Sequence, residues 1–497
     1  MANLPVHVAA VLGAAGAVLV LVSERRAALI AGFAAIAAAE GCFAIASDEA
    51  VRSVIGLSAA AMLLAGLVVV GALTALFVRR PALVMPIALA AAPFRLPLDF
   101  DPTHRFFVAV AGSGELGRLL PLYTVLAAAV LGLLVRCLRE PVVSAIAPEL
   151  ALPAAAFLGY ASLSALWSSD VDAAANRIAF FLLPFAALVA VVARTPFPAW
   201  MPRALAGTAV GLGMLFAAVG LWQAGAKELF FFSQSLEVSN TYTPFFRVTS
   251  LFRDPSLYGR HIVLGISILL VALWVRRVSV PLAAAAIAFM WAGLYFSYSQ
   301  SSLASLFVVA LALPAAAGSP GTRRVIALVA AGVLIVGALL VAYEVRDEST
   351  RRATGDRSRR AELALRVYAD HPVFGAGLGA QPYESQQLDD RPAQEERYVS
   401  HTTPLTVAAE LGTIGLALYA ALLLGAVRLV QRVYRDAAAL GLSLAAALLA
   451  LFVHSLFYSG FFEDPLTWLA LAIAASYLGA RAYATESAVL RPAPGVS

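Results

Sequence analysis

The chain has 497 residues, of which 61% are hydrophobic and only 13% are charged. Soluble domains carry roughly a quarter charged residues, and many apolar runs here approach the ~20 residues that a helix needs to cross a bilayer. Composition therefore excludes an ordinary soluble domain and predicts an all-α polytopic membrane protein. The net charge of +5 is typical of basic cytoplasmic loops, so it does not indicate a nucleic acid partner.

Apolar runs separated by polar loops predict about 12–15 transmembrane helices. The runs over 81–93 and 302–317 are short, so a re-entrant or tilted segment is an alternative to a full span at each of them. In chain order the predicted spans are 6–22, 27–46, 54–78, 81–93, 119–137, 150–167, 178–193, 204–224, 260–275, 280–296, 302–317, 324–343, 404–427, 438–459 and 465–483.

Loop charge alternates along the chain. Every second loop is short and rich in arginine, from residues 24–26 to residues 428–435, and such loops are typical of the cytoplasmic side. The loops between them carry mixed charge and aromatic residues, so we expect them outside, together with the N-terminus. Four parts are predicted: N-terminal transmembrane helices over 1–160, central helices with external arginine motifs over 161–343, a long external loop over 344–403, and C-terminal helices with a short cytoplasmic tail over 404–497.

The external loop over 344–403 is too long for a plain connection, so it is predicted to contain helices of its own. Apolar residues at Leu363, Leu365, Val367 and Tyr368 favour a helix that lies on the membrane surface. The arginine-rich run over 351–360 is, taken alone, most simply a solvated charge run balanced by acidic neighbours.

A second arginine cluster precedes an apolar span. It contains Arg247, Arg253 and Arg260, and Asp254-Pro255 predicts a helix start between them. Three arginines beside a helix N-terminus favour a site for an anionic group. For any single arginine, snorkelling to the membrane interface is the alternative.

His401 stands just before Thr402-Thr403-Pro404, which predicts a helix start. A histidine there is suited to act as a general base, because its pKa lies near neutrality; a histidine that simply faces water is the alternative. Glu410 lies nine residues on, and one regular helix would place it on the face opposite His401. We therefore expect a structural or orienting role for Glu410, and a packing or hydrogen-bonding role for His454.

Other site chemistry is not indicated by the sequence. It contains no metal-ligand cluster, Walker loop or Rossmann glycine pattern, and its two cysteines, Cys42 and Cys137, are far apart. We therefore expect neither a metal nor a cofactor. Gly375-Ala-Gly377-Leu-Gly379 is predicted to be a flexible turn.

Four stretches, all at the predicted outer side of the membrane, resemble motifs of the O-antigen ligase and O-antigen polymerase superfamily. The last two in chain order are the most specific, and together the four cover roughly residues 160–465. They are Leu166-Trp167-Ser168-Ser169-Asp170 with Arg177; Arg247 through Pro255-Ser256; Arg357 followed by Asp370-His371-Pro372-Val-Phe-Gly375-Ala-Gly377-Leu-Gly379; and Ser400-His401-Thr402-Thr403-Pro404 with Glu410-Leu411-Gly412.

The chain departs from the family pattern at several positions. Ser250 stands where the family often has glycine, Ser256 where it often has asparagine, and Ser299-Gln300 where it often has a serine-arginine pair. Spacing to Pro372 leaves open whether Arg357 or Arg360 corresponds to the family arginine.

The resemblance implies a GT-C-like, metal-independent, inverting glycosyltransferase of the bacterial cytoplasmic membrane, with its active site facing outside. It would act on an undecaprenyl-diphosphate-linked glycan and a glycan or lipid acceptor, among membrane lipids. His401 would be the general base. The arginines that would bind the diphosphate are Arg247, Arg357, Arg360, Arg177, Arg253 and Arg260, with Glu410, Asp254 and Tyr258 in support.

Three alternatives remain at this point. A repeat-unit polymerase would use the same chemistry. A transporter or flippase for the lipid-linked glycan predicts charged residues at mid-membrane and internal repeats, neither of which stands out. A structural scaffold predicts that His401 and Arg247 are dispensable.

Overall fold

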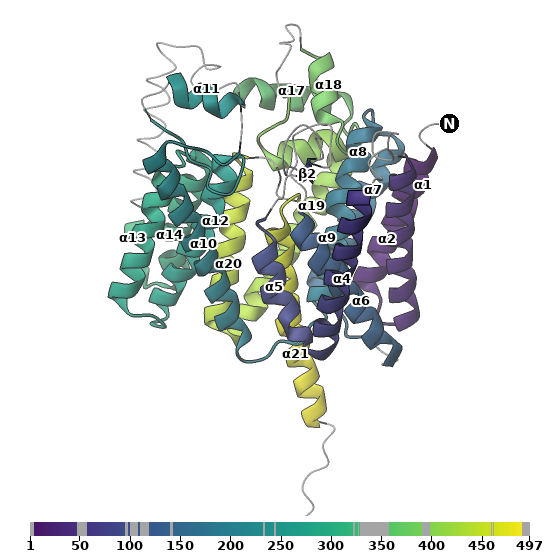
Figure 1. Ribbon diagram of the computed structural model, residues 1–497, viewed down its shortest axis with the longest axis horizontal. Coiled ribbons are helices and arrows are strands. Elements are labelled where there is room, and N and C mark those ends of the chain that lie inside the picture. The colour runs from purple at the N-terminus through teal and green to yellow at the C-terminus, as the bar shows by residue number, and fades with distance from the viewer. Residues whose placement is uncertain are drawn as a thin grey trace, which may run out of the picture. The chain divides into compact units, whose positions relative to one another are not determined.

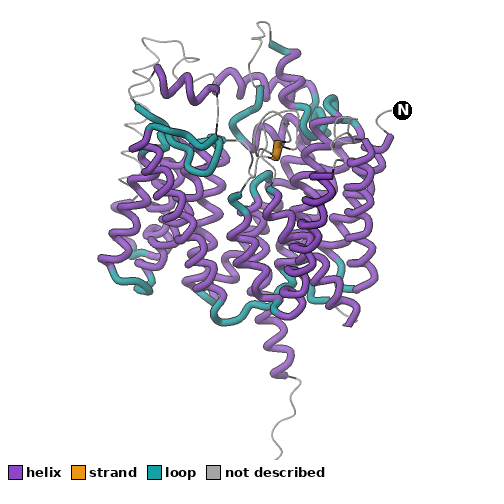
Figure 2. The backbone as a smooth tube through the Cα atoms, in the orientation of Figure 1, coloured by secondary structure: helices purple, strands orange, loops and turns teal. Residues whose placement is uncertain are grey.

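The computed structural model is almost entirely helical over the residues it describes (Figure 2). Those residues are 4–46, 57–94, 98–99, 108–109, 119–139, 143–231, 234–242, 245–321, 324–326, 328, 357–389, 398–458, 460 and 462–489. Among them are nine helices long and apolar enough to cross a membrane, which confirms the all-α polytopic class. The charged run over 351–356 and most of the predicted span 324–343 lie outside the described residues.

The helices form two compact units, and unit 1 comprises Met1–Leu205, Ala417–Ala437 and Phe462–Ser497. Two two-residue strands, β1 (Leu98–Asp99) and β2 (Val108–Ala109), pair in parallel. The helices of unit 1 are α1 (Leu4–Val22), α2 (Arg26–Ala46), α4 (Leu57–Arg79), η1 (Pro81–Leu83), α5 (Val84–Ala91), α6 (Leu120–Arg139), α7 (Pro148–Leu163), η2 (Ser164–Leu166), α8 (Val171–Arg177), η3 (Ile178–Leu182), α9 (Leu183–Val192) and α21 (Pro465–Val489).

Close helix packing in unit 1 depends on small residues. α1 packs against α2, α7 and α9, and a Cβ added at Gly16 or at Gly32 would lie 2.8 Å from a side chain of the opposite helix, Ile36 or Val20. Glycine at such crossings lets two backbones approach closely, as is common between membrane helices.

Arg194 joins several chain segments just beyond α9. Its buried guanidinium donates to carbonyl oxygens of Ser144, Val20, Ala190 and Ser23 at 3.0, 2.9, 3.0 and 2.8 Å. Carbonyls in the last turn of a helix have no partner within the helix. Arg194 therefore supplies donors to the C-terminal ends of both α1 and α9.

Unit 2 comprises Ala206–Leu416 and Ala438–Phe461. In its core α12 packs against α13, α14 and α20. The short helices α11, α17 and α18 lie at one end of the unit, the upper end in Figure 1. The helices of unit 2 are α10 (Met201–Ala226, from Ala206 on), α11 (Gln234–Tyr242), α12 (Pro255–Trp274), α13 (Val280–Tyr295), α14 (Gln300–Ala317), α17 (Arg357–Asp370), α18 (Gln381–Gln387), the first part of α19 (Thr403–Asp436) and α20 (Ala438–Ser455).

Tyr258 is a core residue of unit 2. Its side chain is fully buried, and a Cβ added at Gly220 of α10 or at Gly293 of α13 would lie 2.1 or 2.8 Å from the Tyr258 hydroxyl oxygen. The two glycines therefore make room for this ring, and Tyr258 serves the packing of α10, α12 and α13.

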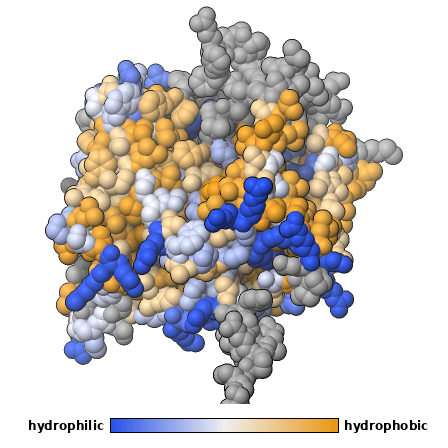
Figure 3. All heavy atoms as spheres, turned by 60° about the horizontal axis from the view of Figure 1, so that its bottom comes forward, coloured by the Kyte–Doolittle hydropathy of each residue, from blue (hydrophilic) through white to orange (hydrophobic). Residues whose placement is uncertain are grey.

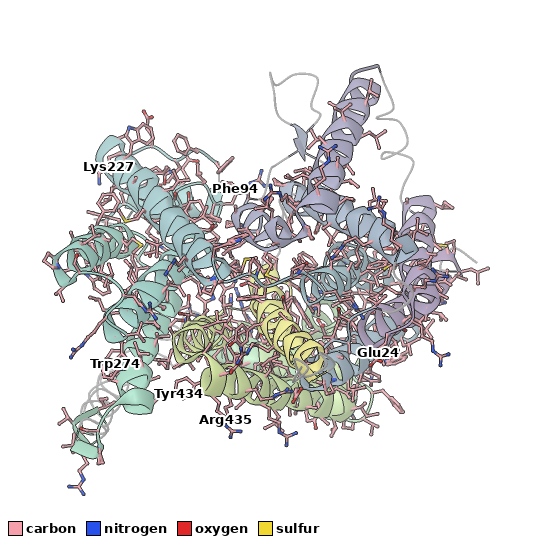
Figure 4. The ribbon with its side chains drawn as sticks, turned by 90° about the horizontal axis from the view of Figure 1, so that it is seen from below. Glu24, Phe94, Lys227, Trp274, Tyr434 and Arg435 are labelled. Carbon is pink, nitrogen blue, oxygen red and sulfur yellow. The ribbon has the colours of Figure 1, made fainter. Side chains whose placement is uncertain are left out.

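The outer surfaces of the helices are hydrophobic. Leu67 on α4, Leu282 on α13 and Leu424 on α19 are each more than half exposed, as expected of side chains that face lipid. Figure 3 shows hydrophobic flanks, with hydrophilic side chains gathered at the lower end that the view brings forward. One basic residue, Arg435, points away from the end of α19 (Figure 4).

Candidate active site

The two most specific sequence motifs form one backbone structure. α19 contains a single non-helical residue, Gly412, with φ 64° and ψ −163°. Just before this break, the carbonyls of Ala409 and Glu410 accept hydrogen bonds at 2.9 Å from the N–H groups of Ala376 and Gly377. The loop that follows α17 thus takes the place of the missing helical turn.

The same loop also pairs with α19 beyond the break. The N–H groups of Thr413 and Ile414 donate to the carbonyls of Pro372 and Val373 at 2.9 and 3.3 Å. The Thr413 hydroxyl donates to the Pro372 carbonyl at 2.8 Å and lies 2.8 Å from the hydroxyl of Tyr368 on α17. The loop is therefore hydrogen-bonded to α19 on both sides of Gly412.

Glycine is required on both sides of this junction. Gly375, Gly377 and Gly379 have φ of 74°, 98° and 80°, a region that favours glycine. A Cβ at Gly375 would lie 2.3 Å from the Glu410 carbonyl, and one at Gly412 would lie 2.3 Å from the Val373 carbonyl. Residues 375–380 are all buried. The segment contains turns, as predicted, and its glycines are buried in the protein interior.

Glu410 is 2% exposed, and its backbone belongs to the junction just described. α19 begins at Thr403, so His401 precedes the helix and the two residues do not share one regular helix. The expectation that Glu410 faces away from His401 on one helix therefore does not apply. A structural role for Glu410 remains our proposal.

α17 brings an arginine into contact with His401. The Arg360 Nη1 atom lies 2.7 Å from the His401 Nε2 atom, and Arg357 lies one turn earlier on the same helix. Burial lowers the pKa of His401 to about 4, with the positive charges of Arg360 and Arg357 as further causes. The imidazole is therefore neutral at neutral pH.

The other arginines of α17 have different partners. Arg359 forms an ion pair with Asp389, which also accepts a hydrogen bond at 2.8 Å from the Tyr398 hydroxyl. Arg366 pairs with Glu362 at 2.6 Å on the exposed face. The contact with His401 singles out Arg360, whereas Arg359 fixes the helix to the segments around it.

Gln381, which the sequence analysis did not identify, holds the segment before His401. Its side chain is fully buried. The amide Nε2 donates to the Tyr398 carbonyl at 2.9 Å and to the Ser385 hydroxyl at 2.7 Å, and Oε1 accepts from the Ser400 N–H at 3.0 Å. The only signal in the sequence was a polar residue two positions after Gly379.

The backbone of Arg247 is held in place by the side chain of Asn240. Asn240 of α11 accepts from the Arg247 N–H at 2.8 Å and donates to the Arg247 carbonyl at 3.1 Å. The guanidinium Nε donates to the Ser297 carbonyl at 3.4 Å. Burial lowers the pKa of Arg247, and the nearby Asp254 carboxylate acts in the opposite direction.

The loop after Arg247 holds a serine in a backbone conformation that favours glycine. Ser250 has φ 53°, in the left-handed region that other residues rarely adopt. The buried Gln223 side chain of α10 accepts from the Thr249 and Ser250 N–H groups at 3.1 and 2.7 Å and donates to the Ser250 carbonyl at 3.0 Å. The Ser250 hydroxyl donates to the Phe216 carbonyl at 2.9 Å. These bonds hold a serine in an unfavourable conformation.

The predicted helix start at Asp254-Pro255 is confirmed. The Asp254 carboxylate caps α12 by accepting from the Ser256 and Leu257 N–H groups at 2.6 and 3.2 Å. Arg253 is exposed in the preceding loop, whereas Arg260 is 6% exposed within the second turn of α12.

Hydrogen bonds place the Arg247 loop and His401 at the same end of unit 2. His454 Nε2 on α20 lies 3.2 Å from both the Ser301 hydroxyl of α14 and the Ser256 carbonyl of α12. The Thr402 hydroxyl donates to the carbonyl of Leu456, just after α20, at 3.2 Å. The predicted hydrogen-bonding role of His454 is confirmed, and α20 is the common support.

Arg177 belongs to unit 1. It ends α8, and its Nε atom lies 3.3 Å from a carboxylate oxygen of Glu463. Asp170 caps α8 by accepting from the Ala173 N–H at 2.9 Å. Arg177 lies in unit 1, whereas Arg247, Arg357 and Arg360 lie in unit 2.

Comparison with known proteins agrees with the motifs. Residues 284–420 match the family model described as O-antigen ligase, a stretch that includes the glycine loop, Arg357, Arg360, His401 and the break in α19. A search of curated proteins found no match. The family match supports the resemblance drawn from the motifs: over residues 284–420 the chain is similar to the O-antigen ligase family.

Proposed function

We propose that the protein is an O-antigen ligase-like glycosyltransferase. It transfers a glycan from an undecaprenyl-diphosphate carrier to an acceptor hydroxyl at the outer face of the cytoplasmic membrane. The observation that carries the proposal is the neutral His401 imidazole in contact with Arg360 of α17. A proton acceptor beside an arginine cluster suits the transfer of a sugar from a diphosphate leaving group.

In the proposed reaction, the acceptor hydroxyl attacks the anomeric carbon while His401 takes its proton. The new carbon–oxygen bond forms as the bond to the carrier diphosphate breaks, and the electron pair of the broken bond leaves with the diphosphate. Attack from the face opposite the leaving group inverts the anomeric centre. His401 then returns its proton to solvent.

Arginines stabilise the leaving group in this proposal. The diphosphate gains negative charge in the transition state, and fixed guanidinium donors lower the energy of that charge. Arg360 and Arg357 approach from α17 and Arg247 from the loop before α12. Arg253 and Arg260 are proposed as further contributors. With this charge supplied by arginine, the reaction needs no metal.

A repeat-unit polymerase would use the same residues, with the hydroxyl of a second carrier-linked glycan as acceptor. The family match supports ligase or polymerase chemistry in general, so product size must separate the two. We favour the ligase because the His401 motif is well formed.

The test is a transfer assay with the purified full-length protein, a lipid-diphosphate-linked glycan, candidate acceptors and a chelator. We compare His401→Ala and Arg247→Ala with Arg366→Ala, which removes an exposed arginine from the same helix as Arg360. Product that survives chelation, is lost in the first two variants and persists in the third supports the proposal. Movement of glycan across a vesicle membrane without covalent transfer would instead identify a transporter.

A further inference from the structure

The contact between Arg360 and His401 fixes the state of the imidazole. A guanidinium carries only hydrogen-bond donors, so at 2.7 Å the His401 Nε2 atom must be the acceptor. The proton of the neutral ring then lies on Nδ1. The lone pair on Nε2, which would accept a proton from a hydroxyl, is therefore already engaged.

The surroundings of His401 also make it a weak base. A general base works best when its pKa lies near the working pH, whereas burial and the charges of Arg360 and Arg357 hold the pKa of His401 at about 4. The remaining α17 arginines act elsewhere, since Arg359 is neutralised by Asp389 and Arg366 pairs with Glu362.

We propose that Arg360 masks the Nε2 atom of His401 until the carrier diphosphate draws the guanidinium away. This inference rests on the proposed function. Doubly charged diphosphate oxygens are far stronger acceptors for a guanidinium than a neutral imidazole nitrogen is, and they allow two parallel hydrogen bonds. Binding of the carrier then frees the lone pair and removes the repulsion that weakens the base.

α17 is built so that the side chain can move while the helix stays in place. The Arg359–Asp389 ion pair ties one face of α17 to the segment after α18. Leu363 and Val367 are buried on another face. Arg357 lies one turn from Arg360, so one diphosphate can engage both. The consequence is an order of events in which the acceptor is deprotonated only after the donor is bound.

The first experiment measures access to the lone pair without using activity. Diethyl pyrocarbonate acylates the free nitrogen of a neutral imidazole, and mass spectrometry of peptides reports the rate at His401. In the full-length protein without carrier, Arg360→Ala should accelerate modification at least about tenfold, because a hydrogen bond to a charged group is lost. Arg360→Lys should give an intermediate rate, and Arg366→Ala should leave the rate unchanged.

The pH dependence of this modification supplies a second readout. In the wild-type protein the rate should stay level as pH falls to about 5, because His401 remains neutral there. In Arg360→Ala one repelling charge is gone, so the pKa rises toward its ordinary value and the rate should fall from a higher pH. Equal rates and equal pH dependence in the two proteins would overturn the inference.

Kinetics then test the role of the diphosphate. The pH profile of kcat/KM reports the free enzyme and that of kcat the complex, so the acidic limb of kcat should lie at the higher pH in the wild type. In Arg360→Ala the acidic limbs of the two profiles should lie at the same pH. If they already lie at the same pH in the wild type, the carrier diphosphate does not draw Arg360 away from His401. If His401→Ala still transfers glycan, the proposed function fails; if only the masking and pH results fail, the function stands and this inference does not.

Discussion

Gly375 and Glu410 lie in backbone contact, so close that a Cβ on the glycine would be 2.3 Å from the Glu410 carbonyl oxygen. One residue belongs to the loop after α17 and the other to α19. Their contact explains why the two most specific motifs occur together, because each supplies the backbone partners that the other lacks. It also sets the distance between α17, which carries Arg360, and the start of α19, which follows His401.

Replacement of Gly375 by alanine should therefore disrupt the site. A non-glycine residue at positive φ costs ~1–2 kcal/mol, and the Cβ clash with backbone atoms adds to this. We expect a lower melting temperature and loss of transfer activity, measured on the purified protein.

The control for Gly375→Ala is Gly211→Ala. Gly211 lies in α10 with nothing within 4 Å of an added Cβ, so alanine there should be neutral or slightly stabilising. A Gly375→Ala protein that melts and reacts like Gly211→Ala would show that the junction tolerates movement.

Gln381→Leu should reduce kcat strongly and should also lower the melting temperature. It removes the amide that holds the Tyr398 carbonyl and the Ser400 N–H, and buried groups left without partners cost ~1–3 kcal/mol. The segment that positions His401 is then free to shift. Transfer rates at saturating substrate and thermal melting measure the two effects. Gln387→Leu, an exposed position on the same helix, should change neither.

The sequence predicted the helices well and the site only in part. Apolar runs located even the short helices α13 and α14, because burial and lipid contact both demand a continuous apolar stretch. The pairing of the glycine loop with Ala409 and Glu410 was not predicted, because these partners lie more than 30 residues along the chain. Gln381 escaped notice for the same reason, since its backbone partners at Tyr398 and Ser400 lie 17 and 19 residues further along the chain.

α17 illustrates both outcomes. A helix was predicted within the long loop and is present. Its apolar residues were expected to face lipid, yet Leu363 and Val367 are buried, and Val367 packs with Ala376, Ala380 and Ala409. Sequence spacing could not separate Arg359 from Arg360 by role, because the roles depend on where Asp389 and His401 lie around the helix.

Asn240→Ala should weaken carrier binding. Asn240 fixes both backbone groups of Arg247, so its loss lets this arginine depart from the position in which it meets the diphosphate. We expect a higher KM for the carrier with a smaller change in kcat. Asn240→Asp retains the acceptor for the Arg247 N–H and should recover part of the affinity. Thr241→Ala, the exposed neighbouring position, serves as control, and an unchanged KM in Asn240→Ala would argue against the role of Arg247.

Arg194→Leu should destabilise unit 1 strongly. The change leaves four carbonyl oxygens without the donors that Arg194 provides, and each buried carbonyl without a partner costs ~1–3 kcal/mol. Lysine lacks the planar fork of donors, so Arg194→Lys should recover little. Thermal melting in detergent tests this, with the exposed Arg203→Leu as control. Equal melting temperatures for the two leucine variants would contradict the prediction.

His401 should also make stability depend on pH. Its pKa is about 4 in the folded protein against ~6.5 in an unfolded chain, so between these values the unfolded state binds more protons. Stability therefore rises with pH in this window and is lost progressively as pH falls from about 6.5 toward 4. His401→Asn removes the group that titrates, so its melting temperature should fall less than that of the wild type between pH 7.5 and pH 5. His371→Asn, an exposed change in the loop after α17, should follow the wild-type curve. A His401→Asn curve that also follows the wild type would mean that the imidazole is not held in its neutral form.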